Sequence, residues 1–162
     1  MAGDETPATR EEVARRGPFW EVVEGRAAPP PAAKFLGWQL VEVDPDAGTI
    51  EISFDATGQM TNPVGDVQGG LLAAMLDDTL GPALVATLPP DQFAPTLDLH
   101  VQFLRPARPG RITGRGHVRS RGRSIAFLAG ELVDDAGAVL AVASATARIR
   151  TQADAPAPSY GG

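Results

Sequence analysis

The stretch that most constrains this chain is residues 62–86, where a polar loop leads into a long run of helix-forming residues. The run starts at the pair Gly69-Gly70, and residues 71–85 are apolar except for Asp77, Asp78 and a threonine. A helix that is apolar on almost every side is a buried helix, so the sequence predicts a core helix here. Carboxylates are seldom buried without a partner or a purpose, which makes the two aspartates candidates for chemistry.

The start of this helix is a second candidate site. The first N–H groups of a helix have no partner within it, and the helix dipole adds partial positive charge there. Glycine at positions 69 and 70 lets a ligand or another backbone come close to those groups. We expect them to stabilise a developing negative charge. Further along, Pro82 cannot donate to the carbonyl of Asp78, which predicts a kink one turn after the carboxylates.

The segments around the helix read as strands. Residues 35–44 and 49–55 predict a hairpin with its turn at 44–48, and residues 134–137 predict a second hairpin turn. The later strands are expected at 96–104, 111–121, 123–133 and 138–149. This order predicts an α+β domain with a six-stranded, largely antiparallel sheet. Such a sheet has open edges, so we expect a homodimer at least.

Residues 111–121 carry small or apolar residues at even positions, and their odd positions include Arg111, Arg115, His117, Arg119 and Arg121. As a strand, this pattern places cations on one face, and the glycines on the other face let a helix lie close. Residues 18–24 predict a short helix that ends before the proline-rich segment 27–31. This N-terminal arm either caps the core or covers a pocket as a lid.

Composition excludes several classes of function. The chain has no cysteine and two histidines, which excludes thiolate chemistry and leaves too few ligands for a histidine-based metal centre. The net charge is −6, which argues against general nucleic-acid binding. Yet residues 105–150 hold nine arginines and three acidic residues, and this local excess of positive charge suits the binding of a small polyanion. The acidic N-terminus and the lack of a long apolar run predict a soluble, cytoplasmic protein.

Asn62, the pair Gly69-Gly70, Asp77 and the later segment Leu104-Arg105-Pro106-Ala107 occur in the order typical of hotdog-fold thioesterases. The chain resembles the phenylacetate-degradation, or PaaI-like, type of that family over roughly residues 35–150. The resemblance implies a hotdog fold, in which the sheet wraps around the central helix. We therefore divide the chain into an N-terminal arm with a short helix (1–31), a hotdog thioesterase domain (32–150) and a disordered tail (151–162).

The resemblance also implies roles for individual residues. Asn62 matches the family's asparagine, Gly69 the glycine whose N–H polarises the thioester carbonyl, and Asp77 the catalytic carboxylate. Thr96 falls near the position where relatives carry Ser or Thr close to the attacking water. Gln68 stands where the commonest motif has His, and glutamine can orient a group but cannot shuttle a proton. This departure weakens any interpretation as a hotdog dehydratase.

The implied activity is hydrolysis of acyl-CoA thioesters to the free acid and CoA. Such hydrolysis needs an oxyanion donor and a base or nucleophile, while the thiolate leaves with little acid help. The helix start supplies the oxyanion donor, and Asp77 supplies the base or nucleophile. No cofactor is expected, because coenzyme A is part of the substrate, and no metal is expected. The expected substrate-binding residues are Gly70, Arg121, Gly122, Arg123 and Ser124.

Each of these residues also has a purely structural explanation. Asp77 could pair with an arginine or face water at a subunit boundary, and Asp78 could be structural. Asn62 and Gln68 could be loop or N-cap residues, and Thr96 could simply start a strand. The arginines of 111–121 could pair with sheet acids such as Asp98 and Glu131.

The whole protein likewise has alternatives. The same fold could serve as a non-catalytic acyl-CoA binding or sensing module, or as a structural dimer without a ligand. A dimer of dimers, and so a homotetramer, is the expected larger assembly, and the acyl group cannot be assigned from these residues.

Overall fold

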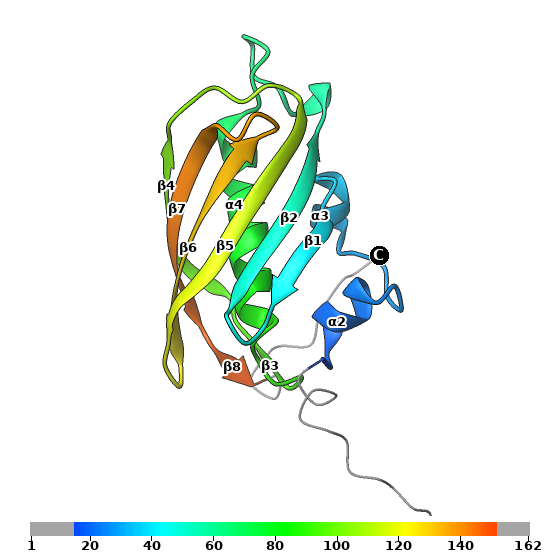
Figure 1. Ribbon diagram of the computed structural model, residues 1–162, viewed down its shortest axis with the longest axis vertical. Helices are drawn as coiled ribbons and strands as arrows, with labels where there is room; N and C mark the ends of the chain where they lie inside the picture. The colour runs from blue at the N-terminus through cyan, green and yellow to red at the C-terminus, as the bar shows by residue number, and fades with distance from the viewer. Residues whose placement is uncertain (1–14, 152–162) are drawn as a thin grey trace, which may run out of the picture.

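A curved six-stranded sheet wraps one long helix in the computed structural model, which describes residues 15–151 (Figure 1). The sheet has the order β1-β2-β5-β6-β7-β4, and every neighbouring pair is antiparallel. Its strands are β1 (Gln39–Asp44), β2 (Thr49–Ala56), β4 (Thr96–Phe103), β5 (Gly110–Arg121), β6 (Ile125–Asp134) and β7 (Val139–Arg148). The helix is α4 (Gly69–Val85). The predicted α+β hotdog fold is therefore confirmed.

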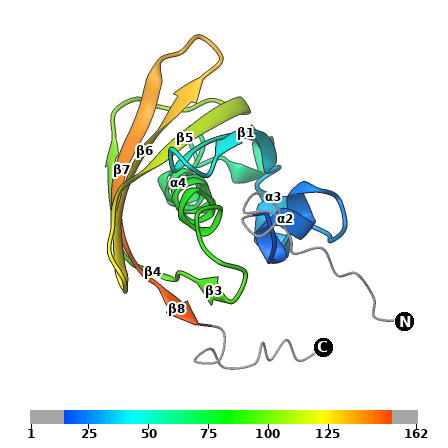
Figure 2. The same ribbon diagram turned by 60° about the horizontal axis from the view of Figure 1, so that its bottom comes forward.

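The smaller elements lie outside the six-stranded sheet. They are α2 (Pro18–Val23), α3 (Pro31–Phe35), the 3-10 turn η1 (Gly58–Met60), β3 (Gln92–Phe93) and β8 (Arg150–Thr151). Figure 2 shows α4 within the curve of the sheet, with α2 and α3 on its far side. The arm thus covers a part of α4 that the sheet leaves open.

Most of the expected strands and both hairpins are confirmed. At the first turn, Oδ1 of Asp44 accepts the N–H groups of Asp46 and Ala47, both at 3.0 Å. At the other turn, Oδ1 of Asp134 accepts two N–H groups in the same way. The first strand begins at Gln39 instead of residue 35, because residues 31–35 form α3. Pro31 has the first helical position, where a missing N–H costs nothing.

The contact between α4 and the sheet is made at glycines of β5 and β6. A Cβ added at Gly114 would overlap the hydroxyl oxygen of Thr79, and one at Gly116 would lie 3.0 Å from the Thr79 methyl carbon. At Gly130 the added atom would lie 2.9 Å from a methyl carbon of Leu80. The expectation that the glycines of 111–121 let the helix lie close is confirmed, and the arginines and the histidine at odd positions of that strand are exposed.

The expectation that α4 is buried on every side is wrong. The buried residues form one face, which is made up of Leu72, Met75, Leu76, Thr79, Leu80, Ala83 and Leu84. Asp77 on the other face is exposed, and Asp78 and Gly81 are half-buried. The sequence has apolar residues on both faces, so its pattern could not show which one meets the sheet. The aspartates therefore mark the face that points away from the sheet.

Within residues 15–151, no helix has both the length and the apolar character required to cross a membrane. The expected disordered tail at 151–162 lies outside the described residues except for Thr151, which pairs with Gln92 in the small β3–β8 sheet. The first half of the expected arm, residues 1–14, also lies outside the described part.

We predict that Gly114→Ala lowers the free energy of unfolding by about 1–3 kcal/mol, because the added methyl group overpacks the α4–sheet contact. Thr79→Ala in the same chain should recover part of this loss, since it removes the overlapping hydroxyl group. Urea unfolding measures both. Gly58→Ala is the control, because a Cβ there meets nothing within 4 Å. Equal stability of Gly114→Ala and Gly58→Ala would contradict the proposed contact.

Candidate active site

Asp77 and Thr96 come together across α4 and β4. The Thr96 hydroxyl donates a hydrogen bond to Oδ1 of Asp77 at 2.7 Å, although the two residues are nineteen positions apart. Thr96 is the first residue of β4, and Asp77 lies in the middle of α4. The hydrogen bond fixes the rotamer of the carboxylate and leaves its second oxygen available. Of the expected catalytic residues, these two are in direct contact.

Asp78 is the less exposed of the two aspartates. Its Oδ2 atom is buried and has no hydrogen-bond partner within residues 15–151. Burial raises the pKa of the Asp78 carboxyl to about 6, with a further contribution from the negative charge of Asp77. Both aspartates line the same cavity. The two carboxyl groups therefore share a cavity but differ in their surroundings, because Asp77 is exposed and accepts a hydrogen bond from Thr96.

The backbone of Asp78 is held by a tryptophan. Pro82 has no N–H to donate to the carbonyl four residues before it, which is that of Asp78. The indole N–H of Trp38 donates to this carbonyl at 3.1 Å and replaces the missing helix hydrogen bond. Trp38 lies between α3 and β1, so this bond ties the base of the N-terminal arm to α4 beside the carboxylates.

A cavity of about 700 Å³, here called the arm chamber, lies between the N-terminal arm and α4. Its walls are α2, the proline-rich segment before α3, Trp38, the outer face of α4 and the segment that leads into β4. Asp77, Asp78 and Thr96 all line it. Ligand cavities typically have volumes of about 300–1,000 Å³, so the arm chamber is large enough for a small molecule.

The other end of α4 forms a separate hollow of about 310 Å³ with the loop before the helix and with the end of β4. Asn62 shapes this loop, because its Oδ1 accepts the N–H groups of Val64 at 3.0 Å and Asp66 at 3.1 Å. The carbonyl of Ala107 accepts the N–H of Val67 at 2.8 Å. The structure thus assigns Asn62 a clear loop-forming contact.

The N–H groups of Gly69 and Gly70 begin the helix, and no acceptor for either lies within residues 15–151. The ring of Phe103 lies over Gly69, where a Cβ would come within 3.4 Å of it. Gln68 occupies the N-cap position, but its exposed side chain makes no capping hydrogen bond. Its backbone N–H donates to the carbonyl of Met60 at 2.8 Å. The free N–H groups therefore come from the two glycines.

One chain does not bring the free N–H groups to the carboxylate. Gly69 and Asp77 are eight residues apart on α4, which corresponds to about 12 Å along the helix axis. They also line different cavities. A reacting carbonyl must lie about 3 Å from both groups, so a single protomer holds the two halves of the expected site apart.

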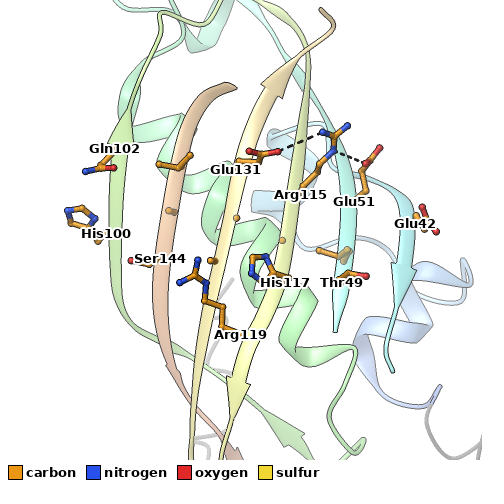
Figure 3. Close-up of a pocket in the computed structure, with 16 residues that line it drawn as sticks. Glu42, Thr49, Glu51, His100, Gln102, Arg115, His117, Arg119, Glu131 and Ser144 are labelled. Carbon is orange, nitrogen blue, oxygen red and sulfur yellow. Dashed lines mark hydrogen bonds and ion pairs between the residues drawn. The ribbon is translucent and has the colours of Figure 1, made fainter. Parts of the chain in front are cut away.

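The outer face of the sheet carries a third hollow, of about 730 Å³ (Figure 3). Arg115 lies between two acids there, with Nε 3.0 Å from Glu51 and Nη1 3.8 Å from Glu131. The prediction that odd-position arginines pair with sheet acids is confirmed for Glu131. Figure 3 shows His100, His117 and Arg119 on the same face, away from α4.

The expected substrate-binding residues 121–124 form the β5–β6 turn. Arg121 donates from Nη1 to the carbonyl of Thr87 at 2.7 Å and to its hydroxyl at 3.0 Å, just after α4. Arg123 and Ser124 are exposed. In the sheet, β6 and β4 lie on either side of β7 and are about 10 Å apart. The β5–β6 turn therefore lies at the same end of the sheet as Thr96, and so as Asp77.

Several residues of this region were not expected from the sequence. Trp38, Gly81 and the residues of α2 all line the arm chamber with Asp77. The proline at position 82 could have signalled the need for a donor to the Asp78 carbonyl, but not which residue supplies it. Among residues 15–151, no three His, Cys, Asp or Glu side chains are grouped closely enough to hold a metal ion.

Comparison with known proteins gives three kinds of result. The Thioesterase superfamily profile matches residues 64–141. A phenylacetic acid degradation-related protein of Ralstonia eutropha, described as a candidate thioesterase, is 42% identical, with a TM-score of 0.78; the match covers 80% of this chain and 98% of that one. No curated protein sequence matches the chain closely enough to count as a relative.

Two other solved structures share the fold at lower identity. The PaaI protein from the phenylacetic acid degradation operon of Escherichia coli is 22% identical, with a TM-score of 0.71; the match covers 80% of this chain and 91% of that one. A thioesterase of Haemophilus influenzae is 19% identical, with a TM-score of 0.74, and the match covers 86% and 94% of the two chains.

We predict that Asp78→Asn stabilises the protein at pH 8. The folded-state pKa of about 6 exceeds the ordinary 3.8, so the folded protein binds more protons than the unfolded chain between about pH 4 and 6. The wild-type stability contributed by this group is present at low pH and is lost as the pH rises through 6. The variant should match the wild type near pH 4 and melt at a higher temperature at pH 8.

Thermal melts across this pH range test the prediction. Asp91→Asn is the control, because Asp91 is an exposed carboxylate outside the arm chamber. A lower melting temperature of Asp78→Asn at pH 8 would show that the charged form of Asp78 is stabilised by a partner, contrary to its buried, unpaired oxygen.

Proposed function

The chain belongs to the thioesterase superfamily, and on this basis we propose that it hydrolyses acyl-CoA thioesters to the free acid and CoA. The observation that carries the proposal is the Asp77–Thr96 pair, a fixed carboxylate on the face of α4 that opens into the arm chamber. Asp77 acts on the thioester either as the base that activates water or as the nucleophile. Thr96 orients the carboxylate, or the water beside it.

The oxyanion of the reaction is stabilised by the N–H of Gly69, with Gly70 beside it. Two unpaired N–H groups at the positive end of a helix dipole support this role. Asn62 and Gln68 position the helix start, Asn62 through its loop hydrogen bonds. The β5–β6 turn, with Arg121, Gly122, Arg123 and Ser124, receives the nucleotide of CoA. The cationic groups in this turn support an anionic partner.

The complete site requires a second copy of the chain. β4 is an edge strand of the sheet, and it exposes Leu97 and Phe103 by 58% and 53%. Its first residue is bonded to Asp77, and its last residue, Phe103, covers Gly69. Antiparallel pairing of β4 with its copy places the end of one strand beside the start of the other. Each Asp77 then faces the Gly69 N–H of the partner chain.

This homodimer carries two sites, and a dimer of dimers is the expected larger assembly. The outer face of the sheet, with acids and arginines side by side, supports such a second contact. We place the reaction in the cytoplasm, because a chain without cysteine needs no oxidising compartment to fold. The alternative of a non-catalytic acyl-CoA binding module is favoured by Gln68, which cannot transfer protons.

We predict that the protein releases free thiol from members of an acyl-CoA panel, and that Asp77→Asn lowers kcat by at least about 10²-fold through loss of the base or nucleophile. A thiol-release assay measures both. Asp91→Asn, which changes an exposed carboxylate elsewhere, should keep full activity. Stabilisation by acyl-CoA without thiol release from any member would favour the binding module and contradict hydrolysis.

We predict that two inactive variants restore activity when they are mixed. Gly69→Pro removes the N–H at the first helical position, where proline is tolerated, and Gln68 already has φ −58 and ψ 131, which suit a residue before proline. Gly69→Ala keeps the N–H and is the matched control. A mixed dimer of Gly69→Pro with Asp77→Asn keeps one intact site, so refolded mixtures should recover about a quarter of wild-type activity. No recovery would contradict a site shared between chains.

A further inference from the structure

We propose that the N-terminal arm forms the binding chamber for the acyl group, and that this chamber selects uncharged, apolar acyl groups. The inference rests on the proposed acyl-CoA function and adds the class of substrate and the residues that select it. Four observations carry it: the position of the arm chamber beside Asp77, its charge, the bare helix surface within it, and the packing of α2.

The arm chamber starts at the reacting group. Asp77 and Thr96 line it at one side, and the outer face of α4 continues from there to Val85. Eight residues separate Asp77 from Val85, which gives a helix surface about 12 Å long. A thioester carbonyl placed at Asp77 can therefore extend its acyl group along this surface, beneath α2.

The helix surface in the chamber is bare at one position. Gly81 follows Asp77 by one turn and lies on the same face, and a Cβ added there would meet nothing within 4 Å. Glycine in the middle of a helix lowers the stability of the helix relative to alanine. The packing of α4 on the sheet does not require this glycine, unlike Gly114 and Gly116 on β5. The open space instead leaves room for a ligand next to the carboxylate.

The lining of the chamber is apolar or acidic. Phe19 and Val22 of α2, the proline-rich segment and Pro82 and Val85 of α4 provide the apolar surface. The charged groups that line it are Glu21, Asp77 and Asp78, and no Lys or Arg of the described residues does so. A carboxylate on the acyl group would meet three acids at short range without a compensating cation. Acyl groups that end in a carboxylate are therefore rejected.

The arm is held as a wall by its own packing. Trp20 of α2 is buried, and its ring contacts Phe19 edge-on with a centroid distance of 5.1 Å. This contact holds the Phe19 side chain, which lines the chamber. At the base of the arm, the hydrogen bond from Trp38 to the Asp78 carbonyl fixes the opposite wall. Of the two interpretations of the arm, a cap or a cover over a pocket, the chamber favours the second.

The test measures binding of CoA thioethers, which have no ester to cleave and so report on the chamber independently of catalysis. Calorimetry compares S-ethyl-CoA with S-hexyl-CoA. At about 0.8 kcal/mol per buried methylene, four extra methylenes should tighten the Kd of the wild type about 200-fold. A thioether that ends in a carboxylate should bind at least 10-fold more weakly than an S-alkyl-CoA of the same length, and Glu21→Gln should narrow that difference.

Gly81→Leu fills the open space and should weaken the binding of S-hexyl-CoA at least 10-fold, while the Kd of S-ethyl-CoA changes less than 3-fold. Gly81→Ala adds only one methyl group and should have an intermediate effect. Phe19→Ala, on the opposite wall, should also weaken S-hexyl-CoA selectively, and it serves if Gly81→Leu does not fold. Equal affinity for the two thioethers in the wild type, or equal weakening of both by Gly81→Leu and Phe19→Ala, overturns the chamber.

The thioether data also separate the two proposals. A length-dependent affinity that is lost in the variants, with no thiol release from the matching thioesters, supports the chamber and overturns hydrolysis. Thiol release together with equal affinities for S-ethyl-CoA and S-hexyl-CoA overturns the proposed chamber but leaves hydrolysis standing. Failure of every thioether to bind and of every thioester to react overturns both.

Discussion

The close approach of α4 to β5 and β6 determines the rest of the structure. Gly114, Gly116 and Gly130 remove the side chains that would hold the helix away from the sheet, and Thr79 and Leu80 fill the space. With this face fixed, helical geometry places Asp77 and Gly81 on the opposite side, since they are one turn apart on another face. The sheet thus decides which part of an almost uniformly apolar helix meets solvent, and that part carries the carboxylates.

A second constraint follows from Pro82, within the same helix. Proline leaves the carbonyl of Asp78 without its helical donor, and the indole of Trp38 supplies one from the start of β1. With any other residue at position 82, the carbonyl of Asp78 would accept a hydrogen bond within the helix. It accepts one instead from Trp38, in the segment that follows the arm. The local defect thereby couples the position of the arm to the two aspartates.

The sequence predicted those features that depend on local chemistry. The turns at 44–48 and 134–137, the two-residue alternation of β5 and the polar loop before Gly69 all depend on neighbours in the chain, and all were found. The close approach of α4 to the glycines of β5 was predicted as well, but other long-range features were not. Apolar residues on both faces of α4 gave no sign of which face the sheet would cover. The hydrogen bond from Trp38 to α4 and the cavity that α2 and α4 line together join segments about 40 or more residues apart, and no local pattern encodes them.

The edge strand β4 links chemistry to assembly. Its start holds the carboxylate through Thr96, and its end covers the helix N-terminus through Phe103, so the two functional groups mark opposite ends of one edge strand. In the proposed dimer, the pairing that satisfies the free edge is the same event that joins an acid to an oxyanion donor. An isolated protomer keeps these groups about 12 Å apart along α4 and cannot place both on one carbonyl. Activity then depends on protomer concentration, and substitutions at exposed positions of β4, such as Leu97, change the number of sites without touching any reacting group.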